Sequence, residues 1–172
     1  MGSQNMEERL SDFAHAQTGH PIDMLEELAR SQSWPWERLS RDDMNLTVAG
    51  SYADYQLAVN WRDDLCGLHI ACLLGLKTPP KRRAAMLDLL ARVNTKLWLG
   101  HFDIWEEEGT LLFRNTMLLS DKHVSVKQCN ALVAHAFKHC EQFLPAFQYL
   151  LWADYGTQQA LDACLFETKG DA

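Results

Sequence analysis

Two histidines, His135 and His139, lie four residues apart in a segment with helical periodicity, and Cys140 follows directly. Side chains four residues apart on a helix are neighbours, so the two imidazoles could share a metal ion. Both imidazoles, however, fall away from the apolar stripe of the helix, whereas Cys140 lies on it. No glutamate stands between them as in the HExxH motif, and no third ligand has a suitable spacing. The pattern favours histidines at the flank of a helix and predicts a protein without a bound metal or cofactor.

Four basic residues, Lys77, Lys81, Arg82 and Arg83, surround the expected start of another helix. Cations at a helix N-terminus oppose its dipole by about 0.3–1 kcal/mol each. An anionic ligand would offset this repulsion, which makes a small-molecule or anion sensor one interpretation. Solvation, or pairing with acidic neighbours such as Asp88, is the simpler interpretation and the preferred one.

A hairpin with an acidic turn that closes on Gly109 carries the most informative combination of side chains. Alternation that buries Phe102 and Phe113 directs four other side chains to the opposite face. We call these four residues the hairpin patch: His101, Asp103, Trp105 and Arg114. Such a composition is typical of a partner-binding surface, but an exposed salt bridge beside an aromatic ring is an equally good structural explanation. A bulged turn at Gly109 would shift the register by one residue and split the patch.

The elements that position these residues follow from the periodicity of the apolar side chains. Helices are expected from Pro21 to about Trp34, from Lys81 to Trp98, from about Val124 with a kink or break at Pro145, and over Gln158–Phe166. Strands are expected at Leu46–Val48, Tyr55–Trp61, Cys66–Leu74, His101–Glu106 and Thr110–Leu118. The sequence therefore predicts an α+β fold, a five-stranded antiparallel sheet with flanking helices. The predicted element order is α-β-β-β-α-β-β-α plus a short C-terminal helix.

Length and composition restrict the possible classes of protein. The 172 residues suit one domain of ordinary size, and 47% hydrophobic and 23% charged residues are typical of a globular chain. A net charge of -7 gives no general attraction to nucleic acid or to anionic lipid. Five cysteines without paired spacing favour a reducing compartment. No apolar run suits a signal peptide or a membrane span. We therefore expect a cytoplasmic protein, with a polar N-terminal arm over residues 1–20 and a single domain over residues 21–172.

The stretch VNTKLWLGHFDIWEEEGTLLFRNTMLL, Val93–Leu119, resembles the YbjN-domain family of bacterial proteins in its alphaproteobacterial form. The resemblance continues through HCEQFLPAFQYLLWA, His139–Ala153, into the terminal helix, and is clearest in the GHFD hairpin together with Arg114. It implies a fold similar to that of the type III secretion chaperones. It also implies a regulator of sensory transduction that binds other proteins, often as a homodimer, and it carries over no catalytic residues.

The chain contains no nucleophile elbow, phosphate-binding glycine loop or dinucleotide fingerprint. Together with the resemblance, this predicts a non-enzymatic, chaperone-like or regulatory module that binds a protein partner. Trp105 and Leu112 would oppose Phe102 and Phe113, so the outer face of the hairpin needs cover from a second copy, a partner or the terminal helix. The alternatives are an enzyme of unrecognised type, with His101, Asp103 and Arg114 as its site, and the small-molecule or anion sensor.

Overall fold

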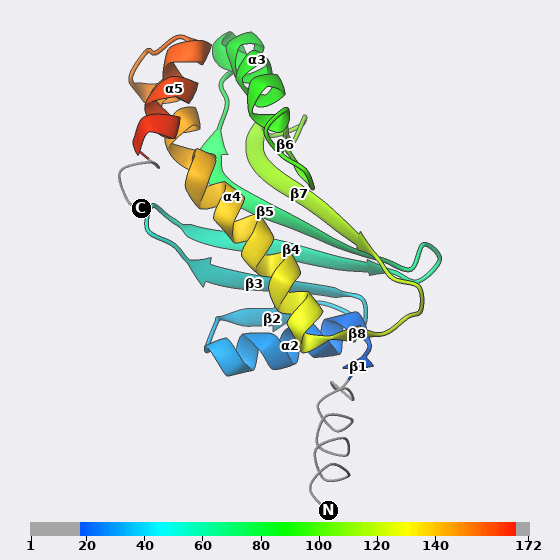
Figure 1. The fold of residues 1–172 in the computed structure, drawn as a ribbon. Coiled ribbons are helices and arrows are strands. Elements are labelled where there is room, and N and C mark those ends of the chain that lie inside the picture. The colour runs from blue at the N-terminus through cyan, green and yellow to red at the C-terminus, as the bar shows by residue number, and fades with distance from the viewer. Residues whose placement is uncertain (1–17, 168–172) are drawn as a thin grey trace, which may run out of the picture.

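A six-stranded antiparallel sheet forms the centre of the computed structural model, which describes residues 18–167 (Figure 1). Its strands are β2 (Trp36–Arg38), β3 (Asp43–Ala49), β4 (Asp54–Arg62), β5 (Gly67–Lys77), β6 (His101–Ile104) and β7 (Thr110–Leu118). The spatial order is β2-β3-β4-β5-β7-β6. Four consecutive strands thus make a meander, and the β6–β7 hairpin joins it through pairing of β7 with β5.

The helices lie on one face of this sheet and at one end of it (Figure 1). They are α2 (Pro21–Gln32), α3 (Arg83–Asn94), α4 (Val126–Trp152) and α5 (Thr157–Glu167), with a short 3-10 turn, η1 (Pro80–Arg82), before α3. Helix α4 crosses β5 and β7, α2 packs beside it on β3 and β4, and α3 and α5 pack against each other and against α4. The α+β prediction is therefore confirmed, and α2 and α4 leave the opposite sheet face uncovered.

The predicted number of strands is wrong, because the sheet has six strands rather than five. The missed strand, β2, has only three residues and directly follows Pro35, so it shows no period-two pattern. Its side chains instead bind α2: Arg38 Nη1 lies 2.6 Å from Asp23 Oδ1 and 3.2 Å from Glu26 Oε2. The Arg30 guanidinium stands 5.4 Å from the centre of the Trp36 ring. Contacts with a helix therefore hold this edge strand, and such contacts leave no mark on local sequence.

Most of the predicted N-terminal arm, residues 1–17, lies outside the described residues. The last part of it is a regular element rather than a loose arm. Thr18–Gly19 forms β1, which pairs with β8 (Val124–Ser125) in a separate two-stranded sheet. His20 then caps α2 by accepting a hydrogen bond from the Ile22 amide at Nδ1, 3.4 Å away, while its Nε2 lies 3.1 Å from Asp42.

Helix α3 ends at Asn94, four residues before the predicted end at Trp98. The Asn94 side chain binds the backbone of β6: its Oδ1 accepts from the Phe102 amide at 2.8 Å, and its Nδ2 donates to the Phe102 carbonyl at 3.0 Å. These two bonds satisfy polar groups on the outer edge of the sheet. The helix therefore stops where its side chain can reach the edge strand.

Helix α4 runs for 27 residues and continues through Pro145, so the predicted break is absent there. Ser125 and Gln128 form a capping box at its start, in which the Ser125 hydroxyl accepts from the Gln128 amide at 3.2 Å. Pro145 itself is buried. Packing of the helix on both sides of the proline compensates for the backbone hydrogen bond that proline cannot make.

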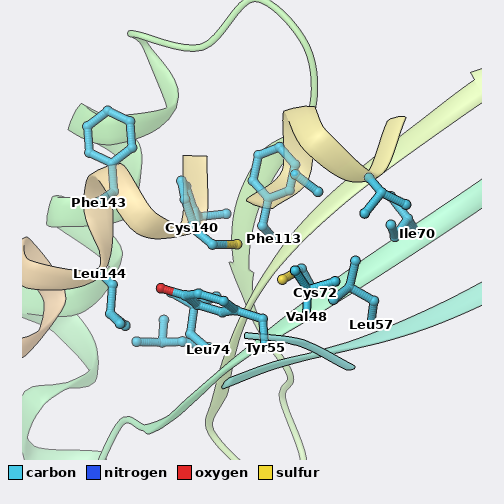
Figure 2. Close-up of a cluster of buried hydrophobic side chains, with 14 of the residues drawn as sticks. Val48, Tyr55, Leu57, Ile70, Cys72, Leu74, Phe113, Cys140, Phe143 and Leu144 are labelled. Atoms are coloured by element: carbon cyan, nitrogen blue, oxygen red, sulfur yellow. The ribbon is translucent and has the colours of Figure 1, made fainter. Parts of the chain in front are cut away.

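The core lies between the sheet and helices α2 and α4, and alternate residues of each long strand point into it. Figure 2 shows Val48, Leu57 and Ile70 on the sheet side of this core. The sulfur atoms of Cys72 and Cys140 face each other across the interface between β5 and α4 (Figure 2). A hydrogen bond to Cys72, together with burial, raises the pKa of the Cys140 thiol. The Cys140 thiol therefore stays protonated, and both buried cysteines act as core groups.

No helix in the described part of the chain combines the length and apolar character needed to cross a bilayer.

Candidate functional site

The register of the β6–β7 hairpin brings the four residues of the hairpin patch to one face. His101 stands opposite Arg114, and Asp103 stands opposite Leu112. The Trp105 amide donates to the Thr110 carbonyl at 2.8 Å, so the pairing continues to the turn. The turn over residues 106–109 does not shift the register, and the predicted common face is therefore confirmed. It is the sheet face opposite the one that α2 and α4 cover, and we call it the open face.

The predicted contact between Asp103 and Arg114 is also present. Arg114 Nη1 donates to Asp103 Oδ2 at 3.3 Å, and the two side chains are 46% and 44% exposed. Asp103 Oδ1 accepts from the Ile104 amide at 2.8 Å. Both carboxylate oxygens thus have hydrogen-bond donors, and Arg114 keeps most of its own donors available.

Replacing Asp103 by alanine is expected to lower the free energy of unfolding by only about 0–1 kcal/mol, because an exposed ion pair is screened by solvent. Urea denaturation of the wild type and of Asp103→Ala would measure the difference, with Asp103→Asn as the isosteric control. A loss of several kcal/mol would contradict the exposed geometry, since that is the cost of breaking a buried pair.

A hollow of about 600 Å³ extends from the hairpin patch across the middle strands of the open face. Its lining comprises Ala58, Asn60, His69, Ala71, Leu73, Arg83, Asp103, Ile104, Trp105, Glu106, Leu112 and Arg114. Ala58 and Ala71 are opposite each other on β4 and β5, so small side chains form the middle of the hollow. Trp105 is 55% exposed, whereas Leu112 is only 5% exposed although it points away from the helices. The exposed indole of Trp105 therefore stands at this hollow, which we call the open-face hollow.

His101 is exposed and does not belong to this lining, whereas the other three residues of the hairpin patch do. Asn60 and His69 of the lining were not named as site residues by the sequence analysis, which named Arg83 only within the basic cluster. The alternation of β5 places His69 on the same face as Ala71 and could have identified it. Nothing in local sequence, by contrast, indicates that Arg83 of α3 reaches a hollow floored by β4 and β5.

His69 stands beside Arg114 on the open face. Its Nδ1 lies 2.9 Å from the Thr116 hydroxyl. Burial lowers the pKa of His69 below its ordinary value, and the positive charges of Arg114 and His101 lower it further. The imidazole is therefore neutral near pH 7.

A second hollow, of about 350 Å³, lies on the side of the open face nearer β2. It is lined by residues of β2, β3 and β4 together with Leu73, and it shares Ala58 and Leu73 with the open-face hollow. The two hollows therefore adjoin at the centre of the sheet. Together they give a depressed surface that crosses the strands from β2 to β6.

The basic cluster does not act as a unit, because two of its four members pair with separate acidic residues. Lys77 Nζ lies 3.7 Å from Glu108 Oε2, and Arg82 pairs with Asp154. Asp88, the acid suggested by the sequence, pairs instead with Arg92, one turn further along α3, at 3.0 Å. Among the predicted cations, only Arg83 is left facing the open-face hollow.

His135 and His139 contact each other, with 3.2 Å between their Nε2 atoms, and both rings pack against Phe113. His139 also stacks on Phe143. Burial lowers the pKa of both imidazoles, so they are neutral near pH 7. Residues 18–167 contain no group of three or more histidine, cysteine, aspartate or glutamate side chains placed to hold a metal. The two histidines therefore lie at the helix flank, as expected, but pack against core aromatic rings.

Comparisons with known proteins agree with this fold. A family model described as "Putative bacterial sensory transduction regulator" matches residues 21–149. The fold is similar to the crystal structure of YbjN from E. coli, "a putative transcription regulator", with a TM-score of 0.51 and 10% sequence identity, over 70% of this chain and 85% of that chain. The crystal structure of the ExsC-ExsE complex gives a TM-score of 0.45 and 14% identity, over 69% and 86%. No curated protein matches the sequence. The family model covers most of the chain, which therefore belongs to the YbjN family.

Proposed function

We propose that this chain is a non-catalytic regulatory or chaperone-like module of the cytoplasm that binds a protein partner with the open face of its sheet. The observation that carries the proposal is the exposed Trp105 beside the open-face hollow, on the face opposite α2 and α4. A large aromatic side chain next to a hollow is the arrangement that anchors protein interfaces. The family description, a regulator of bacterial sensory transduction, supports the same role.

The surface also has the form that a protein segment requires. A standard interface buries about 800 Å² on each partner, which exceeds what one side-chain pocket offers. The two adjoining hollows share Ala58 and Leu73, so one continuous segment could cross several strands. The small alanines at the centre allow the backbone of a partner to approach closely, while Trp105 and Arg114 stand at one end.

Hydrogen bonding around Asp103 supports a binding role over a catalytic one. Its two oxygens accept from the Ile104 amide and from Arg114, so both are already engaged and neither is directed at a substrate proton. His101, the other candidate for acid–base chemistry, projects into solvent rather than into the open-face hollow. We therefore assign the hairpin patch to recognition.

A second copy of the chain is one partner that this proposal includes, because the open face carries apolar side chains that association would cover. Multi-angle light scattering of the purified full chain would give its mass in solution. We expect either a dimer or a monomer that forms a complex with another protein through the same face.

Replacing Trp105 by alanine is expected to weaken dimerisation or partner capture about tenfold or more, because the indole is the largest exposed side chain at the hollow. The variant should keep its fold, since Trp105 is more than half exposed. Quantitative affinity purification from native cells, followed by mass spectrometry, would identify the partner and measure its loss. Trp98→Ala is the matched control, because Trp98 is even more exposed and does not line the hollow.

The proposal would be contradicted if Trp105→Ala captured the same partner to the same extent and had the same mass in solution as the wild type. An unfolded variant together with a strictly monomeric wild type that captures nothing would also contradict it, because Trp105 would then be part of the core.

A further inference from the structure

We propose that the segment bound in the open-face hollow is acidic. It would place a carboxylate on the guanidinium groups of Arg83 and Arg114 and an apolar side chain against Trp105 and Leu112. This inference rests on the proposed function and names the chemistry of the partner: a protein segment in which a glutamate or aspartate adjoins a leucine-like side chain.

The first reason is that two guanidinium groups line the hollow with most of their donors unused. A guanidinium carries five N–H donors in a planar fork that matches a carboxylate. Arg114 spends one of them on Asp103. Arg83 is half-buried, lines the hollow, and forms neither an ion pair nor a side-chain hydrogen bond with any other residue from 18 to 167. The other arginines of η1 and α3, Arg82 and Arg92, each have a carboxylate partner.

The second reason is that the carboxylates of the lining do not neutralise these two arginines. Asp103 already accepts two hydrogen bonds and faces Arg114 alone. Glu106 belongs to the exposed turn, and within the described residues it forms no ion pair with either arginine. At His69, which also lines the hollow, the positive charge of Arg114 adds to burial in lowering the pKa of the imidazole. Arg83 therefore faces the hollow without a counter-charge from residues 18–167, although the whole chain carries a charge of -7.

The third reason is that the remaining lining is apolar and lies next to the arginines. Trp105 exposes its indole, Leu112 stands beside it, and Ala71 leaves space in the floor. A ligand with only a charge would leave this side of a 600 Å³ hollow unfilled. A ligand with only an apolar group would cover Arg83 without supplying a counter-charge, which is costly. A segment that carries both a carboxylate and an apolar side chain would pair with the arginines and also fill the apolar part of the hollow.

The test uses two fluorescein-labelled nonapeptides as probes, one with a leucine flanked by two glutamates and the other with glutamines in their place. Anisotropy titrations with the full wild-type chain should show the glutamate peptide binding about tenfold more tightly, as expected for one charge-assisted pair at a partly exposed site. Arg83→Gln should remove this preference by weakening the glutamate peptide alone. Arg92→Gln, on the same helix but outside the hollow, is the matched control and should change neither affinity. Raising the salt concentration should reduce the difference in affinity between the two peptides, because salt screens the charge interaction.

Equal binding of the two peptides, no binding of the glutamate peptide, or a preference that survives Arg83→Gln would overturn the inference. Trp105→Ala separates this failure from failure of the proposed function. If Trp105→Ala weakens the binding of both peptides, and the wild type binds the two peptides equally, the open face binds partners but does not select acidic ones. If the glutamate preference is present while Trp105→Ala leaves peptide binding and native capture unchanged, the acidic selection stands and the proposed use of Trp105 fails.

Discussion

Gly100→Ala is expected to lower the free energy of unfolding by about 3–4 kcal/mol, through backbone strain and overpacking together. Gly100 has a φ of +72°, in the left-handed region that residues with a side chain avoid. An added Cβ would lie 2.7 Å from the carbonyl oxygen of Arg114 and would also meet the Phe113 ring. The carbonyl is part of β7 and cannot move without disturbing the β6–β7 pairing that aligns the hairpin patch.

Gly75 provides a matched control for this prediction. Its φ is +70°, nearly the same as that of Gly100, but an added Cβ would meet no atom within 4 Å. Gly75→Ala should therefore cost only the left-handed penalty, about 1–2 kcal/mol. Urea denaturation of the three proteins would separate backbone strain from the clash with Arg114 and Phe113. Equal losses in the two variants would show that the hairpin yields to the added methyl group and that the close approach is unimportant.

Glu141→Ala is expected to cost about 3 kcal/mol, because the carboxylate of Glu141 holds the turn between β3 and β4 against α4. Glu141 Oε2 accepts from the Ser51 amide at 2.9 Å, and Oε1 accepts from the Tyr52 amide at 3.4 Å. Oε1 also accepts from the Tyr55 hydroxyl at 2.7 Å, and the Tyr55 ring lies in the core (Figure 2). Alanine would leave these donors without their charged acceptor. Tyr55→Phe removes one of the bonds and should cost about half as much.

The contribution of Glu141 should also depend on pH in a defined direction. Burial raises the pKa of this carboxyl, but the hydrogen bonds from Tyr55, Ser51 and Tyr52 outweigh burial and leave the pKa below its ordinary value. A lowered folded-state pKa stabilises the protein fully above the unfolded value, near 4.3, and the effect is lost as the pH falls through the folded value. The difference in stability between wild type and Glu141→Gln should therefore shrink from about pH 5 to pH 3.

The three histidines with lowered pKa values, His69, His135 and His139, also reduce stability in acid, but they do so equally in both proteins. Taking the difference between wild type and Glu141→Gln removes their effect. A difference that stays constant from about pH 7 to pH 3 would mean that charge at Glu141 contributes nothing.

The alternation of apolar and polar residues predicts the strands that bury one face and expose the other. Leu57, Val59 and Trp61 on β4, and Phe102 and Phe113 in the hairpin, point into the core as their spacing indicates. The same logic correctly assigns the hairpin patch to one face. It fails at β2, β1 and β8, which are two or three residues long, because two or three residues cannot show a period. It also extends α3 too far, since the helix ends where Asn94 binds β6 rather than at a local stop signal.

The candidate site is harder to predict, because it joins residues that are distant in sequence. Arg83 and Arg114 belong to different segments and line one hollow only because α3 packs against β6. In the sequence, Arg83 is one member of a basic cluster. Its neighbours Lys77 and Arg82 pair with Glu108 and Asp154, and only the fold shows that these two acids lie close to them. Ala58 and Ala71 are unremarkable residues in sequence, yet their small size shapes the hollow. The spacing of residues along a strand predicts which sheet face each side chain occupies. A depression in that face depends on the sizes of side chains on neighbouring strands, which the spacing does not predict.

The chain order of the layers has a consequence for synthesis on the ribosome. The meander β2–β5 is complete at Lys77, and its pairings are all between consecutive strands, so it can form early. Its buried face, however, is closed by α4, which begins only at Val126. A nascent chain therefore presents an uncovered row of apolar side chains while some fifty further residues are added, a few seconds at ordinary elongation rates. During that interval α2 alone shields the strands, and the growing polypeptide depends on it, or on cellular folding factors, to avoid pairing with its neighbours.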